Sequence, residues 1–292
     1  MAIIGQILAI LASICGAVAS IRYNQLGKQA DSDVMAYLRM CIAVPVMLLY
    51  SLLADGFIIP SIPINTTLAL IVSGIIGFFV TDLFMFRAYV SWGARETMVV
   101  MCLAPVLSAL LAFLIFGETM TALQILGSSL SIVGIIIMVA GDNQGAKAAL
   151  TSGALYALLA ACLQSIADMS AKGALDTMPW VTASAVRAVG GIAAWIIFGA
   201  IKGKAFFKNA KVFGKPKAFA GLFITVLIGT ALGTTCAMGA LNFAPAGIVT
   251  SLKQISPLFI LPYEVIFTKK RLTAASVLGT VISVAGVFLI FF

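Results

Sequence analysis

The residues of this sequence best suited to chemistry are ionisable side chains inside long apolar segments. Asp82, Asp168, Arg187, Lys253 and Glu264 are all flanked by runs of apolar residues. A charged side chain at the centre of a lipid bilayer costs about 2.5–3.5 kcal/mol on insertion scales, so such residues mark solute-binding sites, proton sites or ion pairs. The chemistry that they predict is the binding of a charged solute or the carriage of a proton.

Asp82 lies near the middle of the apolar segment 67–90, and two interpretations of it stay open. It is a structural partner of Arg87, although a spacing of five is poor on a helix, or it is a cavity-lining carboxylate that binds a cationic group or a proton. Arg39 lies close enough to a helix end for its long side chain to reach water. We therefore expect a structural role for Arg39.

Lys253 and Gln254 lie just before Pro257 in the segment 246–267. The Lys253 ammonium is suited to bind an anionic group of a substrate as a point charge. The alternatives are an ion pair with Asp82 or a reach toward the outer surface. The neighbourhood of this lysine thus predicts part of a binding site.

Glu264 lies two helical turns beyond Pro257, in the inner third of the same segment. It is placed either to pair with Lys269 or Arg271 or to carry a proton. Asp82 and Glu264 are therefore the candidate proton-coupling residues.

Asp168 and Arg187 lie in adjacent segments that a short loop joins. An ion pair between them is expected, because each removes the desolvation cost of the other. Gln164 precedes Asp168 by one turn on the same helix face, where it hydrogen-bonds a substrate or locks two helices together. The candidate substrate-binding residues are Asp82, Lys253, Gln254 and Gln164.

Three prolines lie inside apolar segments and predict kinks: Pro105, Pro257 and Pro262. Each proline removes a backbone hydrogen bond, and in lipid the freed carbonyl must find another partner or face a wet cavity. These helices are therefore expected to be walls of a site and hinges. Glycines spaced by seven predict close packing of two further segments: Gly127, Gly134, Gly279 and Gly286.

Several kinds of chemistry are not supported. The sequence has no histidine, and its five cysteines form no close pair, so no metal site and no disulfide framework are expected. It also lacks the Gly-x-x-x-x-Gly-Lys-Ser/Thr loop that cradles nucleotide phosphates. No cofactor, no nucleic-acid partner and no enzymatic activity are therefore predicted.

The composition places these residues in a membrane protein. Of 292 residues, 62% are hydrophobic and 10% are charged, against about 45–50% and 25% in soluble domains. A bilayer core needs about 20 mostly apolar residues for each crossing. The sequence predicts an all-α protein with ten transmembrane helices, the first of them not a removed signal peptide, over 3–21, 34–54, 67–90, 94–116, 121–140, 151–172, 179–201, 218–242, 246–267 and 273–292.

Basic residues are concentrated on one side of these helices. The loops after odd-numbered helices, with the flanking helix ends, hold 14 of them and the opposite side holds only Lys172. Cytoplasmic loops are enriched in lysine and arginine. We therefore expect a multi-pass protein of the inner membrane with both termini outside. The 14 are Arg22, Lys28, Arg87, Arg95, Lys147, Lys202, Lys204, Lys208, Lys211, Lys215, Lys217, Lys269, Lys270 and Arg271.

The chain contains a weak internal repeat. Residues 77–139 align without gaps with residues 229–291 at a shift of 152, and Arg39 aligns with Arg187 at a shift of 148. The predicted halves are residues 1–145 and 146–292, with five helices each. Because five is odd, the second half enters the membrane inverted, an arrangement that places substrate sites at the repeat interface in known transporters.

These features resemble the drug/metabolite transporter superfamily, in particular its ten-helix EamA-type members. The matching marks are an arginine in the second helix and a proline in the fourth helix of each half, then Gly117-Glu118 and the glycines of the fifth helix: Arg39, Arg187, Pro105, Pro257, Gly127 and Gly134. The resemblance implies a transporter without identifying its substrate. It also implies that Lys253 meets a substrate anion, as lysines in this helix do in relatives that carry phosphorylated compounds.

The chain departs from that family at three places. It has Cys15-Gly16 where many members have Trp-Gly, and Leu163-Gln164 at the equivalent place in the second half. An aromatic box for a quaternary ammonium or a flat ring is therefore not expected. Glu118 is matched by Lys270, and the predicted termini lie on the opposite side from those of many relatives.

Together these observations predict a secondary transporter of a small polar metabolite, an amino acid or a small organic anion, that works by alternating access and uses a proton as candidate coupling ion. A flippase for a lipid-linked phosphate or sugar is the alternative. The expected partners are a small-molecule substrate and the lipid bilayer, and the expected assembly is a monomer or homodimer.

Overall fold

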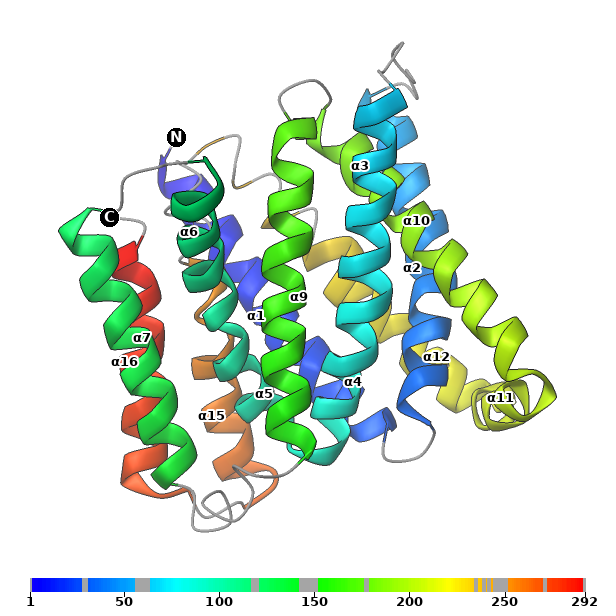
Figure 1. The fold of residues 1–292 in the computed structure, drawn as a ribbon. Coiled ribbons are helices and arrows are strands. Elements are labelled where there is room, and N and C mark those ends of the chain that lie inside the picture. The colour runs from blue at the N-terminus through cyan, green and yellow to red at the C-terminus, as the bar shows by residue number, and fades with distance from the viewer. Residues whose placement is uncertain are drawn as a thin grey trace.

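The computed structural model describes residues 2–27, 31–55, 64–116, 121–141, 152–175, 179–233, 236–237, 240, 243, 252–269 and 272–290. All elements in these residues are helices (Figure 1). They are α1 (Ala2–Gly27), α2 (Ser32–Asp55), α3 (Ile64–Gly74), η1 (Ile75–Val80), α4 (Thr81–Ser91), α5 (Ala94–Met101), α6 (Leu103–Phe116), α7 (Ala122–Gly141), α9 (Ser152–Leu175), α10 (Trp180–Lys202), α11 (Lys204–Asn209), η2 (Ala210–Gly214), α12 (Pro216–Val226), η3 (Leu227–Leu232), α15 (Ser256–Ile266) and α16 (Ala274–Ile290).

These helices confirm an all-α membrane protein. Seven helices of the described residues are long and apolar enough to cross a membrane, and three shorter apolar helices cover Pro216–Thr230, Ser256–Ile266 and Ala274–Ile290. Each of the ten predicted segments coincides with one of them. Both termini lie at the same end of the molecule (Figure 1), as an even number of crossings requires. Which end faces the cytoplasm stays a prediction from the charges.

The third and fourth helices of each half are interrupted at equivalent places. The third helix contains a π-helical segment in both halves, η1 over Ile75–Val80 and η3 over Leu227–Leu232, at the same shift of 152 as the sequence repeat. The fourth helix breaks at Cys102 in the first half and at residues 254–255 in the second. Each break precedes Pro105 or Pro257 by two or three residues, because a proline cannot donate the next helical hydrogen bond.

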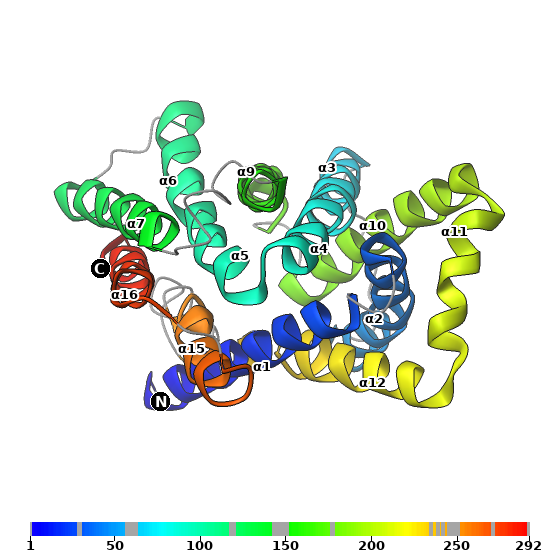
Figure 2. The ribbon, with the colours of Figure 1, turned by 90° about the horizontal axis from the view of Figure 1, so that it is seen from below.

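The fifth helices of the two halves, α7 and α16, lie side by side along one edge of the molecule (Figures 1 and 2). Their glycines place the backbones in contact. A Cβ atom at Gly134 would fall on the backbone of Ser283, and one at Gly279 on the backbone of Met138. Ser131 and Ser283, also related by 152, share a hydrogen bond of 3.4 Å between their hydroxyls.

The lysine-rich stretch 202–217 was expected to be a loop, but in the structure it is mostly helical. It forms the short helix α11 and the 3-10 turn η2. Phe206 and Phe213 are buried, and the Phe206 ring lies 5.7 Å from the ring of Tyr37. The aromatic residues between the lysines therefore fold this segment back against the helix bundle.

Candidate functional site

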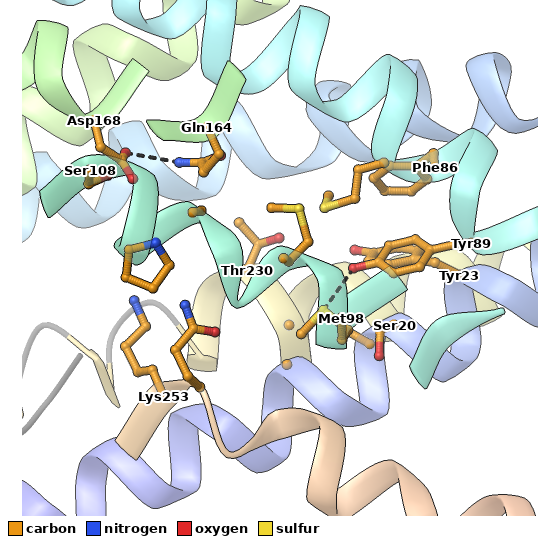
Figure 3. A pocket seen from close by; sticks show the side chains of 18 of the residues that line it. Ser20, Tyr23, Phe86, Tyr89, Met98, Ser108, Gln164, Asp168, Thr230 and Lys253 are labelled. Carbon is orange, nitrogen blue, oxygen red and sulfur yellow. Dashed lines mark hydrogen bonds between the residues drawn. The ribbon is translucent and has the colours of Figure 1, made fainter. Parts of the chain in front are cut away.

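A cavity of about 680 Å³ lies between the two halves (Figure 3). Its volume is within the range of about 300–1,000 Å³ usual for small-molecule sites. It reaches from Gln124, in the first turn of α7, and Ile290, the last residue of α16, to Tyr23 and Tyr89. The cavity thus extends inward from the end of the molecule that carries both termini (Figure 1).

Equivalent positions of the two halves meet in this cavity. Gly16 and Ser20 of α1 line it together with their counterparts Gln164 and Asp168 of α9, at a shift of 148. Met101 and Lys253 form another equivalent pair, at a shift of 152. The cavity therefore lies on the interface between the inverted repeats, where substrate sites lie in transporters with this architecture.

One part of the cavity is polar and charged. Lys253, Gln254, Gln164, Asp168 and Ser108 line it (Figure 3). Gln164 Nε2 donates to Asp168 Oδ1 at 2.9 Å. Three of the four predicted substrate-binding residues are thus brought together, although they lie on two helices that are about 90 residues apart in the sequence.

Lys253 is the cation of this polar part that has no ion pair with any residue the structure describes. Lys253 and Asp168 both line this part of the cavity (Figure 3). The lysine is helical and directly precedes the break at Gln254 and Ile255. The break before Pro257 therefore places both Lys253 and Gln254 at the cavity wall.

Asp168 and Arg187 form the predicted ion pair, with Arg187 Nη2 at 3.3 Å from Asp168 Oδ1. The Asp168 side chain is 44% exposed, because it faces the cavity as well as its partner. Both described bonds of this carboxylate, to Gln164 and to Arg187, use Oδ1. Asp168 is therefore a cavity residue in addition to an ion-pair residue.

Asp82 is not one of the described residues that line the cavity. Within the described part of the chain it pairs with neither Arg87 nor Lys253. Its Oδ2 accepts from Arg39 Nη2, and both side chains are largely buried. Arg87 binds Asp33 through two hydrogen bonds of 2.8 and 2.6 Å. The predicted Asp82–Arg87 pair is therefore wrong, and the arginine that neutralises Asp82 is itself part of the cavity wall.

The inner end of the cavity, its floor, carries aromatic side chains that the sequence did not indicate. Tyr23, Phe86 and Tyr89 line it with Met98 (Figure 3). The Tyr23 and Phe86 ring centroids are 4.9 Å apart, and the Tyr89 hydroxyl donates to Met98 Sδ at 3.2 Å. The expected lack of an aromatic surface rested on tryptophan positions alone. Tyr23, one turn after the cavity-lining Ser20, was the available signal.

Beyond the floor, at the opposite end of the molecule, lies a second cavity of about 490 Å³. Glu264 of α15 lines it and accepts a hydrogen bond of 2.6 Å from Arg95 Nε. Arg95 also bonds Glu96 at 2.8 Å, and its side chain is 0% exposed. The described partner of Glu264 is therefore Arg95, which the charge pattern had placed near a loop. Arg271 lies outside the described residues.

Hydrogen bonds join the two halves around this second cavity. Gln25 of α1 donates to the Tyr263 hydroxyl of α15, and Arg95 of α5 reaches Ser276 of α16 at 3.0 Å. The halves are thus tied together at the end of the molecule that lacks the termini.

The three predicted kink residues lie in the fourth helices of the two halves. Pro105 lines the cavity. Pro257 is buried at the start of α15, one residue after Ser256, which hydrogen-bonds Ser13 of α1. Pro262 lies inside α15. In the described residues, no group of three histidine, cysteine or acidic side chains is placed to hold a metal ion.

The sequence matches the family described as "EamA-like transporter family" twice, over residues 3–140 and 151–292. An uncharacterized transporter of Archaeoglobus fulgidus is 22% identical over 284 residues, which cover 97% of this chain and 96% of that protein. One crystal structure resembles the fold with a TM-score of 0.60 and 17% identity, covering 95% of each chain. The family match spans both halves and leaves out only the connection between them and the first two residues.

Proposed function

Since the chain belongs to the EamA-like transporter family, we propose that it is a secondary transporter that moves a small polar metabolite, an amino acid or a small organic anion, by alternating access. The observation that carries this proposal is the cavity between the halves. It has the volume of a small-molecule site, and equivalent residues of both repeats line it. Lys253 supplies a positive charge that forms no ion pair with any described residue.

The unequal depth of the cavities at the two ends of the molecule supports alternating access. The main cavity approaches the end with the termini, while Gln25–Tyr263 and Arg95–Glu264 join the halves at the other end. In the opposite state these bonds break as the halves rock, and the second cavity becomes continuous with the substrate site. The helix breaks at Cys102 and Gln254 are the hinges in this proposal, because the missing hydrogen bonds lower the cost of bending there.

We further propose that a proton is the coupling ion and that Asp82 or Glu264 carries it. Each carboxylate is bound to a buried arginine, Arg39 or Arg95. Protonation would weaken that ion pair and free the arginine, which links proton binding to a conformational change. The cell membrane, with both termini outside, is the proposed location.

Solute counterflow in proteoliposomes tests this function. Vesicles loaded with one unlabelled metabolite from a panel of amino acids, organic acids and sugars should accumulate the labelled form of a substrate transiently. Lys253→Ala should abolish counterflow at normal protein abundance, because the cavity loses its unpaired cation. Lys215→Ala, a change at an exposed lysine outside the cavity, is the matched control and should transport normally.

The same vesicles test the proton. Imposed pH gradients should drive accumulation by the wild-type protein. The variant that removes the coupling group, Asp82→Asn or Glu264→Gln, should lose gradient-driven accumulation and keep substrate exchange. Movement of a lipid-linked phosphate or sugar across the bilayer, with no counterflow of any soluble metabolite, would instead support the flippase.

A further inference from the structure

Resting on the proposed transport function, we propose that the substrate is an organic monoanion whose carboxylate binds Lys253 and whose other end carries an acceptor oxygen for Tyr23 and Arg39. An apolar body joins the two ends. This class is narrower than the amino acid or organic anion considered above, and it excludes zwitterions as the preferred substrate. Three independent features of the cavity lead to it.

The first feature is the charge balance. The described side chains that line the cavity and carry a charge are Arg39, Lys253 and Asp168. The ion-pair partners behind them are Asp82 and Arg187. Three cations and two carboxylates leave one positive charge, which a monoanion neutralises and a zwitterion does not. Uncompensated charge is costly inside the membrane, so the occupied cavity favours the monoanion.

The second feature is the way in which Asp168 is already used. An amino acid would need a carboxylate for its ammonium group, and Asp168 is the described carboxylate that lines the cavity. Its charge is already neutralised by the ion pair with Arg187, although both of its described hydrogen bonds use Oδ1. An ammonium group would compete with Arg187 for this carboxylate and add a cation beside two others.

The third feature is a pair of buried hydrogen-bond donors beside the cavity. Tyr23 is 5% exposed, and its hydroxyl lies near the Thr230 side chain without a hydrogen bond of good geometry; Nε of Arg39 has no hydrogen-bond partner among the described residues. Buried polar groups are almost always hydrogen-bonded in proteins. Tyr23 lies at the cavity floor near Thr230 of the π-helical segment η3 (Figure 3), Arg39 lines the same cavity, and π-helical turns are frequent at functional sites.

Between the charged end and the floor, the cavity wall is apolar and polarisable. Met85, Met98 and Met101 line it with Phe86. Methionine adapts to apolar shapes and makes favourable contacts with aromatic rings. The body of the substrate that crosses this part should therefore be aliphatic or aromatic, with no polar groups along its length.

Four related compounds separate these requirements, with binding measured by calorimetry on the purified full-length protein and transport in proteoliposomes. 3-(4-Hydroxyphenyl)propanoate carries the carboxylate, the apolar body and the distal oxygen. Tyrosine adds the ammonium group, 3-phenylpropanoate lacks the distal oxygen, and tyramine lacks the carboxylate. We expect the first compound to bind at least about tenfold more tightly than each of the others, equivalent to about 1.4 kcal/mol.

Two variants locate the distal oxygen. Tyr23→Phe should reduce the preference for 3-(4-hydroxyphenyl)propanoate over 3-phenylpropanoate from about tenfold to about twofold or less, since the hydroxyl donor is gone. Tyr156→Phe, at a tyrosine that packs against Phe84 outside the cavity, should keep the full preference. Tyr23→Phe should also unfold near the wild-type temperature, because it keeps the buried ring and removes a hydroxyl that makes no hydrogen bond of good geometry.

Tighter binding of tyrosine than of 3-(4-hydroxyphenyl)propanoate would overturn the inference, as would an unchanged preference in Tyr23→Phe. Failure of the oxygenated anion to bind a protein that does transport another soluble metabolite would overturn the inference alone. Absence of counterflow for every soluble metabolite would overturn the proposed function itself.

Discussion

Neutralising Asp82 should strongly destabilise the protein, because it leaves the Arg39 guanidinium charged and buried. The two side chains are 4% and 11% exposed. Removing one member of a buried ion pair typically costs about 3–5 kcal/mol, whereas replacing both members is often close to neutral. We therefore expect Asp82→Asn to lower the free energy of unfolding by about 3 kcal/mol, and the double change with Arg39→Met to recover most of that loss.

The Asp33–Arg87 pair is the internal control for this cycle. It has the same chemistry and good two-point geometry, but Arg87 is 32% exposed. Exposed ion pairs contribute about 0–1 kcal/mol, so Asp33→Asn should cost about 1 kcal/mol or less. The comparison separates the effect of burial from the effect of losing an aspartate.

Thermal unfolding of the four proteins of the cycle in detergent micelles measures these differences, with Asp33→Asn as the fifth sample. The expected order is wild type, Asp33→Asn and the double variant close together, with Asp82→Asn well below them. If the losses of unfolding free energy measured for Asp82→Asn and for Arg39→Met simply add in the double variant, the two residues act independently. That result would refute the assignment of Arg39 as the partner of Asp82.

Three further predictions concern other parts of the molecule. Single alanine changes at Asp168 and Arg187 should each cost about 1 kcal/mol, less than at Asp82 because Asp168 is 44% exposed; the charge-swapped double variant should recover part of the folded yield, and additive losses would exclude the pair. Gly134→Ala should cost about 1–3 kcal/mol through overpacking against the backbone of Ser283, whereas Gly214→Ala, with nothing near its Cβ position, should be nearly neutral in the same unfolding assay. Alkaline phosphatase fused after Phe292 should be active, because the charge distribution places the C-terminus outside; activity of a cytoplasmic reporter there would reverse the orientation.

The sequence was sufficient for the features that depend on local pattern and on the repeat. Ten apolar segments of membrane-spanning length predicted the helices, since each must satisfy its own backbone in lipid. The glycines of α7 and α16 predicted a close approach that the structure contains between Gly134 and Ser283. Asp168 and Arg187 could be paired because a short loop forces their helices to be neighbours.

The features that sequence reasoning missed depend on packing between distant helices. Arg87 was the candidate structural partner of Asp82 because both are on one helix, with a cavity-lining carboxylate as the alternative, but tertiary packing brings Arg39 of α2 to it. Arg95 was counted with the loops because it lies at the start of the predicted segment 94–116; in the structure α5 begins there, after Gly93 with φ at +136°. Its burial against Glu264 follows from the contact of α5 with α15, which spacing along the chain does not reveal.

The aromatic floor and the π-helical segments were missed for a different reason. Phe86 and Tyr89 lie in an apolar segment in which any aromatic residue is expected, and Tyr23 lies two residues beyond the predicted first helix, so the meeting of α1 and α4 is what brings them together. The π-helical segments are visible in the sequence only as the equivalence of residues 75–80 and 227–232. Neither of these two segments contains a residue type that specifies a π-helical turn.

The most direct test of the central claim restores the charge at Lys253 chemically. Lys253→Cys should be inactive in counterflow, and 2-aminoethyl methanethiosulfonate should restore transport because the product carries an ammonium group on a side chain of nearly lysine length. The methyl reagent, which adds no charge, should not restore it, and wild-type protein treated with each reagent is the control for the five native cysteines. Rescue by the charged reagent alone is the result that the account predicts. Full transport by untreated Lys253→Cys would contradict the placement of Lys253 in the substrate site.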